Sequence, residues 1–179
     1  GNLSNLEHLA LQSNQLTGSL PDQLASMTKI RDVSLDNNQF SGVLPYWLGS
    51  VTSLQQLFLG NNDFSGPIPP ELGNLTGLLR LSLPHNQFSG LLPVSLINLV
   101  NLCLPDGNWP CWDQYGLDLG YNYLTTPATP QELADFLAIK DPDWATTQTV
   151  PFTGCENIAE ISVSECEALV ALYNSTDGP

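Results

Sequence analysis

Large apolar residues recur at a fixed spacing along the first part of the chain. They follow the pattern LxxLxL, and the next group of this kind comes 24 residues later. In the LxL step, apolar residues such as Leu9 and Leu11, or Leu57 and Leu59, flank one residue of variable type. This is the period of a β-strand that buries one face, so the pattern predicts one short strand in every unit.

Three other residue types keep the same spacing. The columns are Asn14, Asn38, Asn62 and Asn86; Gly18, Gly42, Gly66 and Gly90; and Pro21, Pro45, Pro69 and Pro93. The shared pattern is LxxLxLxxNxLxGxLPxxLxxLxx, which indicates a tandem repeat. One unit of this size is too small to bury its own apolar residues, so we expect successive units to stack into a solenoid.

This pattern resembles the leucine-rich repeat family, in the 24-residue form with an LxGxLP segment that is known from plant extracellular receptors and polygalacturonase inhibitors. The resemblance covers residues 1–104 closely and residues 117–124 in part. Residues 117–151 resemble the closing segment of bacterial secreted proteins that carry these repeats. The resemblance implies an α/β-type solenoid: a segment of a right-handed horseshoe with a concave parallel sheet, short convex turns and a C-terminal helical cap.

The repeated asparagines are expected to be structural. Each follows a predicted strand where the chain turns, and its side-chain amide is expected to bond backbone groups of both neighbouring coils. The predicted ladder consists of Asn14, Asn38, Asn62, Asn86 and Asn122. Asn122 belongs to a fifth unit and comes 36 residues after Asn86, which indicates an insertion within this unit.

The repeats divide the chain into four predicted parts. Residues 1–104 hold four full repeats and begin in the middle of one, as expected of an excerpt from a longer tandem protein or of a trimmed chain. Residues 105–144 contain the interrupted fifth repeat and a capping helix. Residues 145–154 are expected to be a linker, and residues 155–179 the start of a further helical cap or module.

The capping helix is predicted from its start signal and its apolar face. Thr129 is the expected N-cap and Pro130 the first helical residue, and the helix ends near Lys140. Its apolar side chains are expected to cover the last coil together with Trp144, because open solenoid ends need caps.

Four cysteines, Cys103, Cys111, Cys155 and Cys166, lie in the irregular parts of the chain. They form no CxxC motif and no histidine is near them, which argues against a zinc site. Disulfides are therefore expected, with free buried thiols as the alternative. The sequential pairs Cys103–Cys111 and Cys155–Cys166 are the simplest of the three possible connectivities. Disulfides indicate an oxidising compartment, so we expect an extracellular or cell-surface protein.

The charge of the chain narrows its partners. It has 18 acidic and 4 basic residues and a net charge of −14, which makes nucleic acid and anionic membranes poor partners. No apolar run approaches the ~20 residues of a membrane span, so membrane insertion is not expected. The Asp- and Asn-rich turns recur with the repeat, and neither His8 nor His85 lies in a nucleophile motif. We therefore expect no metal, no cofactor and no catalytic residue.

The residues that alternate with the core leucines are candidates for binding. They are expected to face outward from the concave sheet, and their types vary while the core stays constant. The candidates are His8, Asp32, Asp36, Gln56, Phe58, Arg80, His85, Asp118 and Tyr121. Aromatic residues with polar surroundings are typical of an interface centre. We predict a non-enzymatic extracellular module that binds a protein, peptide or glycan through its concave face.

The alternative is a structural role. The chain would then be a self-assembling component of a cell-surface layer, an adhesin stalk or an extracellular filament. An array that begins in the middle of a repeat exposes apolar residues and a strand edge, which is a template for head-to-tail self-association. Inhibition of a secreted enzyme is a special case of binding and is implied only by the family resemblance.

Overall fold

The computed structural model describes residues 3–104, 115–125 and 130–149. These residues belong to a compact unit, Gly1–Thr149, and a second unit, Val150–Pro179, lies outside the described residues. The module predicted at 155–179 is therefore still a prediction. The first unit extends to Thr149, so the first residues of the predicted linker are part of this folded unit.

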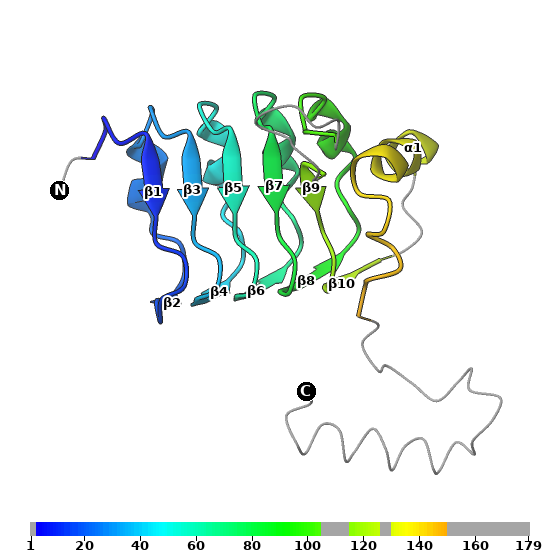
Figure 1. Ribbon diagram of the computed structural model, residues 1–179, viewed down its shortest axis with the longest axis horizontal. Coiled ribbons are helices and arrows are strands. Elements are labelled where there is room, and N and C mark those ends of the chain that lie inside the picture. The colour runs from blue at the N-terminus through cyan, green and yellow to red at the C-terminus, as the bar shows by residue number, and fades with distance from the viewer. Residues whose placement is uncertain (1–2, 105–114, 126–129, 150–179) are drawn as a thin grey trace, which may run out of the picture. The chain divides into compact units, whose positions relative to one another are not determined.

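Two parallel five-stranded sheets run along the first unit (Figure 1). The first sheet has the order β1 (His8–Ala10), β3 (Asp32–Ser34), β5 (Gln56–Phe58), β7 (Arg80–Ser82) and β9 (Leu117–Asp118). The second has the order β2 (Thr17–Gly18), β4 (Gln39–Gly42), β6 (Asp63–Gly66), β8 (Gln87–Gly90) and β10 (Tyr123–Leu124). We number the coils 1 to 5 by the strands of the first sheet. The predicted solenoid is confirmed, with the strand expected at each LxL step, and each coil adds a second strand that the sequence did not predict.

The second sheet occupies the side of the coil where the sequence predicts only turns. It is accompanied by four 3₁₀ helices, Asp22–Ser26, Tyr46–Ser50, Pro70–Asn74 and Val94–Asn98. Strands β4, β6 and β8 each end on a glycine of the repeated column, at φ values of 85°, 76° and 85°. Glycine adopts this conformation without steric cost, which explains the column. Each of these strands carries a single large apolar residue, Phe40, Phe64 or Phe88, so no period-two pattern marks it, and the strands form because equivalent backbone segments stack one coil apart.

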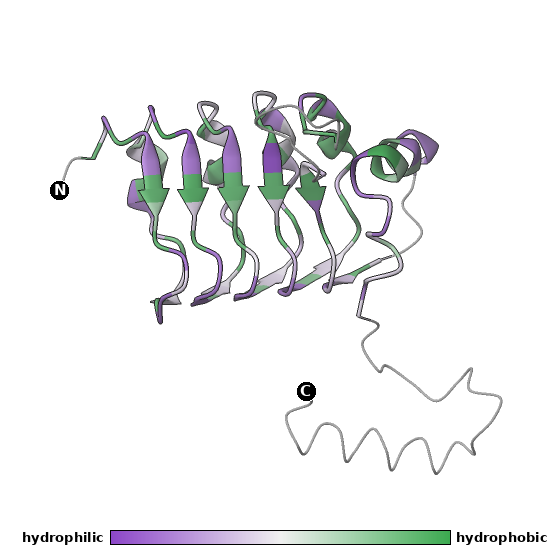
Figure 2. Ribbon diagram, in the orientation of Figure 1, coloured by the Kyte–Doolittle hydropathy of each residue, from purple (hydrophilic) through white to green (hydrophobic). Residues whose placement is uncertain are grey.

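Apolar residues of successive coils form one core. The middle residue of each central strand is buried, and Leu57 and Leu81 are each 1% exposed. Figure 2 shows β1, β3, β5 and β7 changing from hydrophilic to hydrophobic along their length in the same way. In the second sheet the rings of Phe40, Phe64 and Phe88 stack, with centroids 6.1 and 6.2 Å apart. Each ring packs on the next coil, so burial in one coil depends on its neighbours.

Asn62 shows how the asparagine ladder joins the coils. Its Oδ1 accepts the backbone N–H of Phe40 in the preceding coil at 3.0 Å, and its Nδ2 donates to the Leu35 carbonyl there at 3.1 Å. The same Nδ2 donates to the carbonyls of Leu59 and Gly60 in its own coil at 3.0 and 3.2 Å. The equivalent bonds are made by Asn38, Asn86 and Asn122. Each side chain therefore bonds the preceding coil and its own, whereas the sequence predicted bonds to both neighbours.

Asn14 differs because no described coil precedes it. Its Nδ2 bonds only the carbonyls of Leu11 and Gln12 in its own coil, and the side chain is exposed. Asn122, in coil 5, is 0% exposed. The same asparagine position is thus exposed at one end of the array and fully buried at the other.

Helix α1 (Gln131–Lys140) lies beside the last coil (Figure 1). It ends where the sequence predicts and begins one residue later, while the predicted N-cap Thr129 is outside the described residues. Leu133 and Leu137 are 0% exposed and Trp144 is 6% exposed, and all three belong to the core. The predicted helical cap over coil 5 is therefore present.

Residues 141–149, here called the edge segment, cover the open strand edge of coil 5. In coil 3 the N–H of Leu59 donates to the Ser82 carbonyl of the next coil at 2.9 Å. The equivalent N–H in coil 5, that of Leu119, donates to Oδ2 of Asp141 at 2.7 Å. A side-chain carboxylate therefore replaces the missing carbonyl of a sixth strand.

Gln148 of the edge segment takes the place of a sixth ladder asparagine. Its Oε1 accepts the N–H of Leu124 at 3.2 Å, and its Nε2 donates to the Leu119 carbonyl at 3.0 Å. These are the same two backbone positions that Asn62 bonds in coil 2. The N–H of Tyr121 donates in addition to the Thr147 carbonyl at 3.0 Å. The edge segment thus satisfies backbone groups that a further repeat would otherwise bond.

Asn62→Leu should destabilise the protein by about 2–4 kcal/mol, because the buried N–H of Phe40 and three buried carbonyls lose a hydrogen-bond partner. Asn14→Leu is the matched control: that side chain is exposed and bonds only its own coil, so its loss should cost less than about 1 kcal/mol. Urea unfolding followed by circular dichroism measures both values. Equal midpoints for Asn62→Leu and the wild type would contradict the role of the ladder.

Candidate binding surface

The outward side chains of the first sheet form a surface that we call the strand face. Its first row, at the start of β1, β3, β5 and β7, consists of His8, Asp32, Gln56 and Arg80. Its second row, at the ends of the strands, consists of Ala10, Ser34, Phe58, Ser82 and Asp118. Three further candidates, Asp36, His85 and Tyr121, lie in the turns that follow the strands. All the predicted binding residues are exposed or half-buried, so the core does not occupy them.

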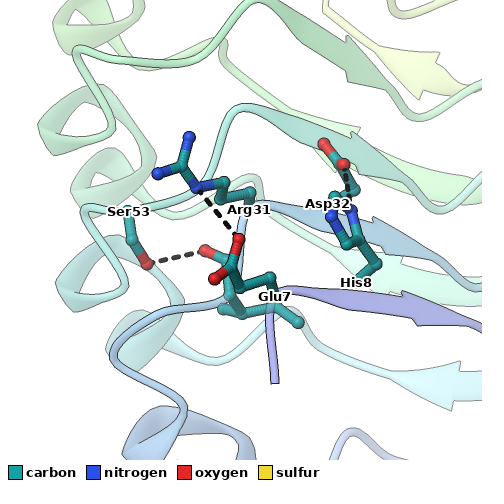
Figure 3. A network of polar contacts seen from close by, with 6 residues as sticks. Glu7, His8, Arg31, Asp32 and Ser53 are labelled. Atoms are coloured by element: carbon teal, nitrogen blue, oxygen red, sulfur yellow. Dashed lines mark hydrogen bonds and ion pairs between the residues drawn. The ribbon is translucent and has the colours of Figure 1, made fainter. Parts of the chain in front are cut away.

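Ion pairs hold charges at the coil 1 end of the strand face (Figure 3). Nδ1 of His8 lies 2.5 Å from Oδ2 of Asp32, and Nε of Arg31 lies 3.7 Å from Oε2 of Glu7. The side chains of His8, Arg31 and Glu7 are all more than half exposed, so these pairs contribute little to stability. Each of these contacts joins a side chain of coil 1 to one of coil 2 on the surface.

A cavity of about 440 Å³ opens at the other end of the strand face, where β7 and β9 meet the edge segment. The strand face contributes Phe58, Arg80, Ser82 and Asp118 to its lining, the edge segment contributes Asp141, Asp143 and Thr147, and Tyr115 and Tyr121 line it as well. Ligand pockets typically have volumes of about 300–1,000 Å³, and this cavity falls within that range.

Aromatic rings gather at this cavity. Tyr115 and Tyr121 are 44% and 50% exposed. The ring of His85 stacks on that of Tyr121, with centroids 4.2 Å apart and planes 6° apart. Both residues have a φ of 53°, a left-handed conformation that is uncommon outside glycine, and the repeat places it directly before each ladder asparagine. The ladder thus fixes the turn from which this aromatic pair projects.

Asp141 is the buried carboxyl of the cavity and is 8% exposed. Its pKa is raised to about 7, mainly by burial and in smaller part by the nearby carboxyls of Asp118 and Asp143. The N–H of Leu119, which donates to Oδ2, acts in the opposite direction by stabilising the charged form. The group therefore changes its charge near neutral pH, while it also closes the sheet edge.

The structure divides the predicted binding residues into groups. It brings Phe58, Arg80, Asp118 and Tyr121 to the cavity, with His85 stacked beside them. The others lie elsewhere: His8 and Asp32 pair at the far end, Gln56 lies between, and Asp36 lies in the turn after β3. No pattern in the sequence indicates that Asp141, Asp143, Thr147 and Tyr115 belong to the same site. The sequence predicts only that the helix ends near Lys140, directly before Asp141.

Other predicted chemistry falls partly outside the described residues. Cys103 is buried and disulfide-bonded, but Cys111, Cys155 and Cys166 lie outside the described residues, so their pairing is still a prediction. Within the described ranges, no three His, Cys, Asp or Glu side chains are grouped so that they could hold a metal ion. No helix in this part of the chain has the length and apolar character needed to cross a membrane.

Asp141→Asn should remove part of the pH dependence of stability. The folded-state pKa is about 7, above the ordinary value of 3.8, so the stabilising contribution of this group is present below about pH 4 and is lost as the pH rises through about 7. Asparagine still accepts the Leu119 N–H but does not ionise. The free energy of unfolding of the variant, relative to that of the wild type, should therefore rise by up to about 4 kcal/mol between about pH 4 and pH 8.

Urea unfolding at several pH values measures this difference. Asp63→Asn, which removes an exposed carboxyl from the second sheet, is the control and should show no comparable change with pH. A difference between Asp141→Asn and the wild type that stays constant with pH would contradict the assignment.

Known proteins share this architecture. The family model described as Leucine Rich Repeat matches residues 5–27, 29–51 and 53–75. The chain is 35% identical to the leucine-rich-repeat ectodomain of the plant membrane receptor kinase GASSHO1/SCHENGEN3 from Arabidopsis thaliana, solved in complex with CASPARIAN STRIP INTEGRITY FACTOR 2. The TM-score is 0.66, and the match covers 76% of this chain and 15% of the receptor chain.

Two further solved structures extend the comparison. The Arabidopsis receptor kinase HAESA, in complex with the peptide hormone IDA and the co-receptor SERK1, is 28% identical over 89% of this chain and 23% of its own, with a TM-score of 0.65. A plant ice-binding protein is 29% identical over 54% of this chain and 31% of its own, with a TM-score of 0.52. No curated protein sequence matches the chain.

The chain thus spans less than a third of the length of each of these three structures. The repeat match, the two parallel sheets and the asparagine ladder nevertheless agree on the architecture. Residues 5–75 of this chain carry leucine-rich repeats, and the described coils continue the same architecture.

Proposed function

We propose that this chain is a non-enzymatic, extracellular recognition module that binds a peptide, or a peptide segment of a protein, through its strand face. The observation that carries this proposal is the cavity at the coil 5 end of the strand face. Residues of variable type from three coils and from the edge segment converge there, although the repeat itself does not require any of them. A concave site with aromatic walls and a few polar groups is the usual form of a binding pocket.

The similar structures support the class of ligand. The receptor HAESA binds the peptide hormone IDA, and the GASSHO1/SCHENGEN3 ectodomain was solved with CASPARIAN STRIP INTEGRITY FACTOR 2. The latter is an ectodomain of a membrane receptor, which also supports an extracellular location. The similar plant ice-binding protein shows that this fold carries other functions, so the proposal depends on the cavity and not on the fold.

The parallel sheet also gives a reason for an extended ligand. Equivalent residues of neighbouring coils lie opposite one another in register, so that Gln56 faces Arg80 and Phe58 faces Ser82. A peptide lying across the strands would meet one side chain of each row per coil, at the spacing of about 4.8 Å between strands. Glycan binding and head-to-tail self-association are still predictions without a structural observation of their own.

Phe58→Ala and Arg80→Ala should each weaken peptide binding by about 1–3 kcal/mol, because both remove a contact at the cavity. Gln23→Ala, an exposed change in the first 3₁₀ helix, is the control and should bind as the wild type does. Peptides are first selected from a random dodecapeptide phage library on the immobilised chain. Their affinities for the three variants are then measured by calorimetry, with circular dichroism to check the fold.

Two results would contradict the proposal. One is a library that yields no peptide binding to the folded chain. The other is a set of peptides whose affinity falls for Gln23→Ala and is unchanged for Phe58→Ala and Arg80→Ala.

A further inference from the structure

We propose that the cavity at the coil 5 end of the strand face takes a cationic side chain, lysine or arginine, of the bound peptide. This inference rests on the proposed function and adds the chemistry of one position in the ligand. It follows from the charges that line the cavity, from the remaining acceptor capacity of one carboxyl and from the aromatic rings beside it.

The charge of the lining is the first argument. Three carboxyls, those of Asp118, Asp141 and Asp143, line the cavity, and Arg80 is the one basic residue among its lining residues. A second cation in the cavity would therefore meet an excess of negative charge.

The buried carboxyl of Asp141 is the second argument. Its Oδ2 accepts the N–H of Leu119, but its Oδ1 accepts no hydrogen bond from any described residue. A carboxylate accepts more than one hydrogen bond, so the group has capacity for a further donor. An ammonium or guanidinium group in the cavity would supply one.

The size and shape of the site favour an organic cation over a metal ion. No group of three acidic, His or Cys side chains within the described residues is arranged to hold a metal, although three aspartates line the cavity. At about 440 Å³ the cavity has room for a whole side chain. The carboxyls thus lie around a space and do not converge on one point.

The aromatic rings suit the rest of a basic side chain. Phe58, Tyr115 and Tyr121 line the cavity together with the carboxyls. Aromatic faces attract cations, and they also pack against the aliphatic stem of lysine or arginine. Carboxylates and aromatic rings together would therefore distinguish a basic side chain from both an acidic and a purely apolar one.

Protonation of Asp141 connects binding to pH. Its pKa of about 7 means that the group is mostly neutral in mild acid and mostly charged in mild base. The charged form attracts a cation more strongly, so the affinity for a basic side chain should rise as the pH increases through 7. A neutral side chain of the same length should show no such dependence.

The test is an NMR titration of the ¹⁵N-labelled full chain. The ligands are the N-acetyl methylamides of lysine and arginine, with that of norleucine as the neutral control. The amides of Leu119 and Gly120, which donate to Asp141 and Asp118, report on the cavity. The two basic arms show which cation fits better. Either should shift these signals, and bind about five-fold or more tightly at pH ~8.5 than at pH ~5.5.

Variants separate the cavity from general charge attraction. Asp143→Asn and Asp141→Asn should each weaken binding of the better basic ligand by about five-fold, and Asp141→Asn should also remove most of the pH dependence. Asp63→Asn, which removes one carboxyl from the second sheet, is the matched control and should bind as the wild type does. Norleucine binding as tightly as lysine and arginine, or equal losses in all three variants, would overturn the proposal.

These failures differ from a failure of the proposed function. If the selected phage peptides lose affinity with Phe58→Ala but carry no basic residue that matters, the strand face still binds peptides and only the cationic position is wrong. If no peptide binds, both proposals are wrong.

Discussion

Each strand of a parallel solenoid needs backbone partners from the next coil, and this requirement shapes the whole molecule. In the interior the next coil supplies them, as when Leu59 donates to the Ser82 carbonyl at 2.9 Å. The ladder asparagines meet the same need with their side chains, as when Asn62 bonds Leu35 after β3 and Phe40 of β4 in the preceding coil. Among the described residues no sixth coil follows coil 5, and the carboxyl of Asp141 and the amide of Gln148 take over these bonds. Unpaired groups at a buried edge would otherwise cost about 1–3 kcal/mol each.

The candidate site is a consequence of this solution. Because core leucines, the asparagine ladder and backbone bonds hold the coils together, residues on the strand face are free to vary. The segment that closes the edge stands next to that face, and the cavity lies where the two meet. Asp141 takes part in both, since one oxygen bonds Leu119 and the residue also lines the cavity. Closing the solenoid and forming a pocket thus depend on the same few residues.

The sequence predicts what repeats and misses what occurs once. The LxL step predicted the first sheet, and the asparagine column predicted side chains that bond backbone groups between coils, because a fixed spacing puts equivalent residues into equivalent surroundings. The second sheet was missed because its central strands, QFSG, DFSG and QFSG, each hold one large apolar residue and so show no alternation. Gln148 and Asp141 were missed because they make the bonds of a further coil without standing at that coil's positions in the sequence repeat. Nothing in their spacing relates Gln148 to Asn122, so no periodic pattern could place it beside Leu124.

The account's central claim is that the edge segment substitutes for a sixth coil. Amide hydrogen exchange measured by NMR tests it most directly. The N–H groups of Leu119 and Leu124 bond the edge segment, and those of Leu59 and Phe64 bond the next coil in the same positions. If the edge segment substitutes for a sixth coil, the exchange rates of the coil 5 amides should lie within about ten-fold of those of the coil 3 amides. Fast exchange of Leu119 and Leu124, with Leu59 and Phe64 still protected, would contradict it.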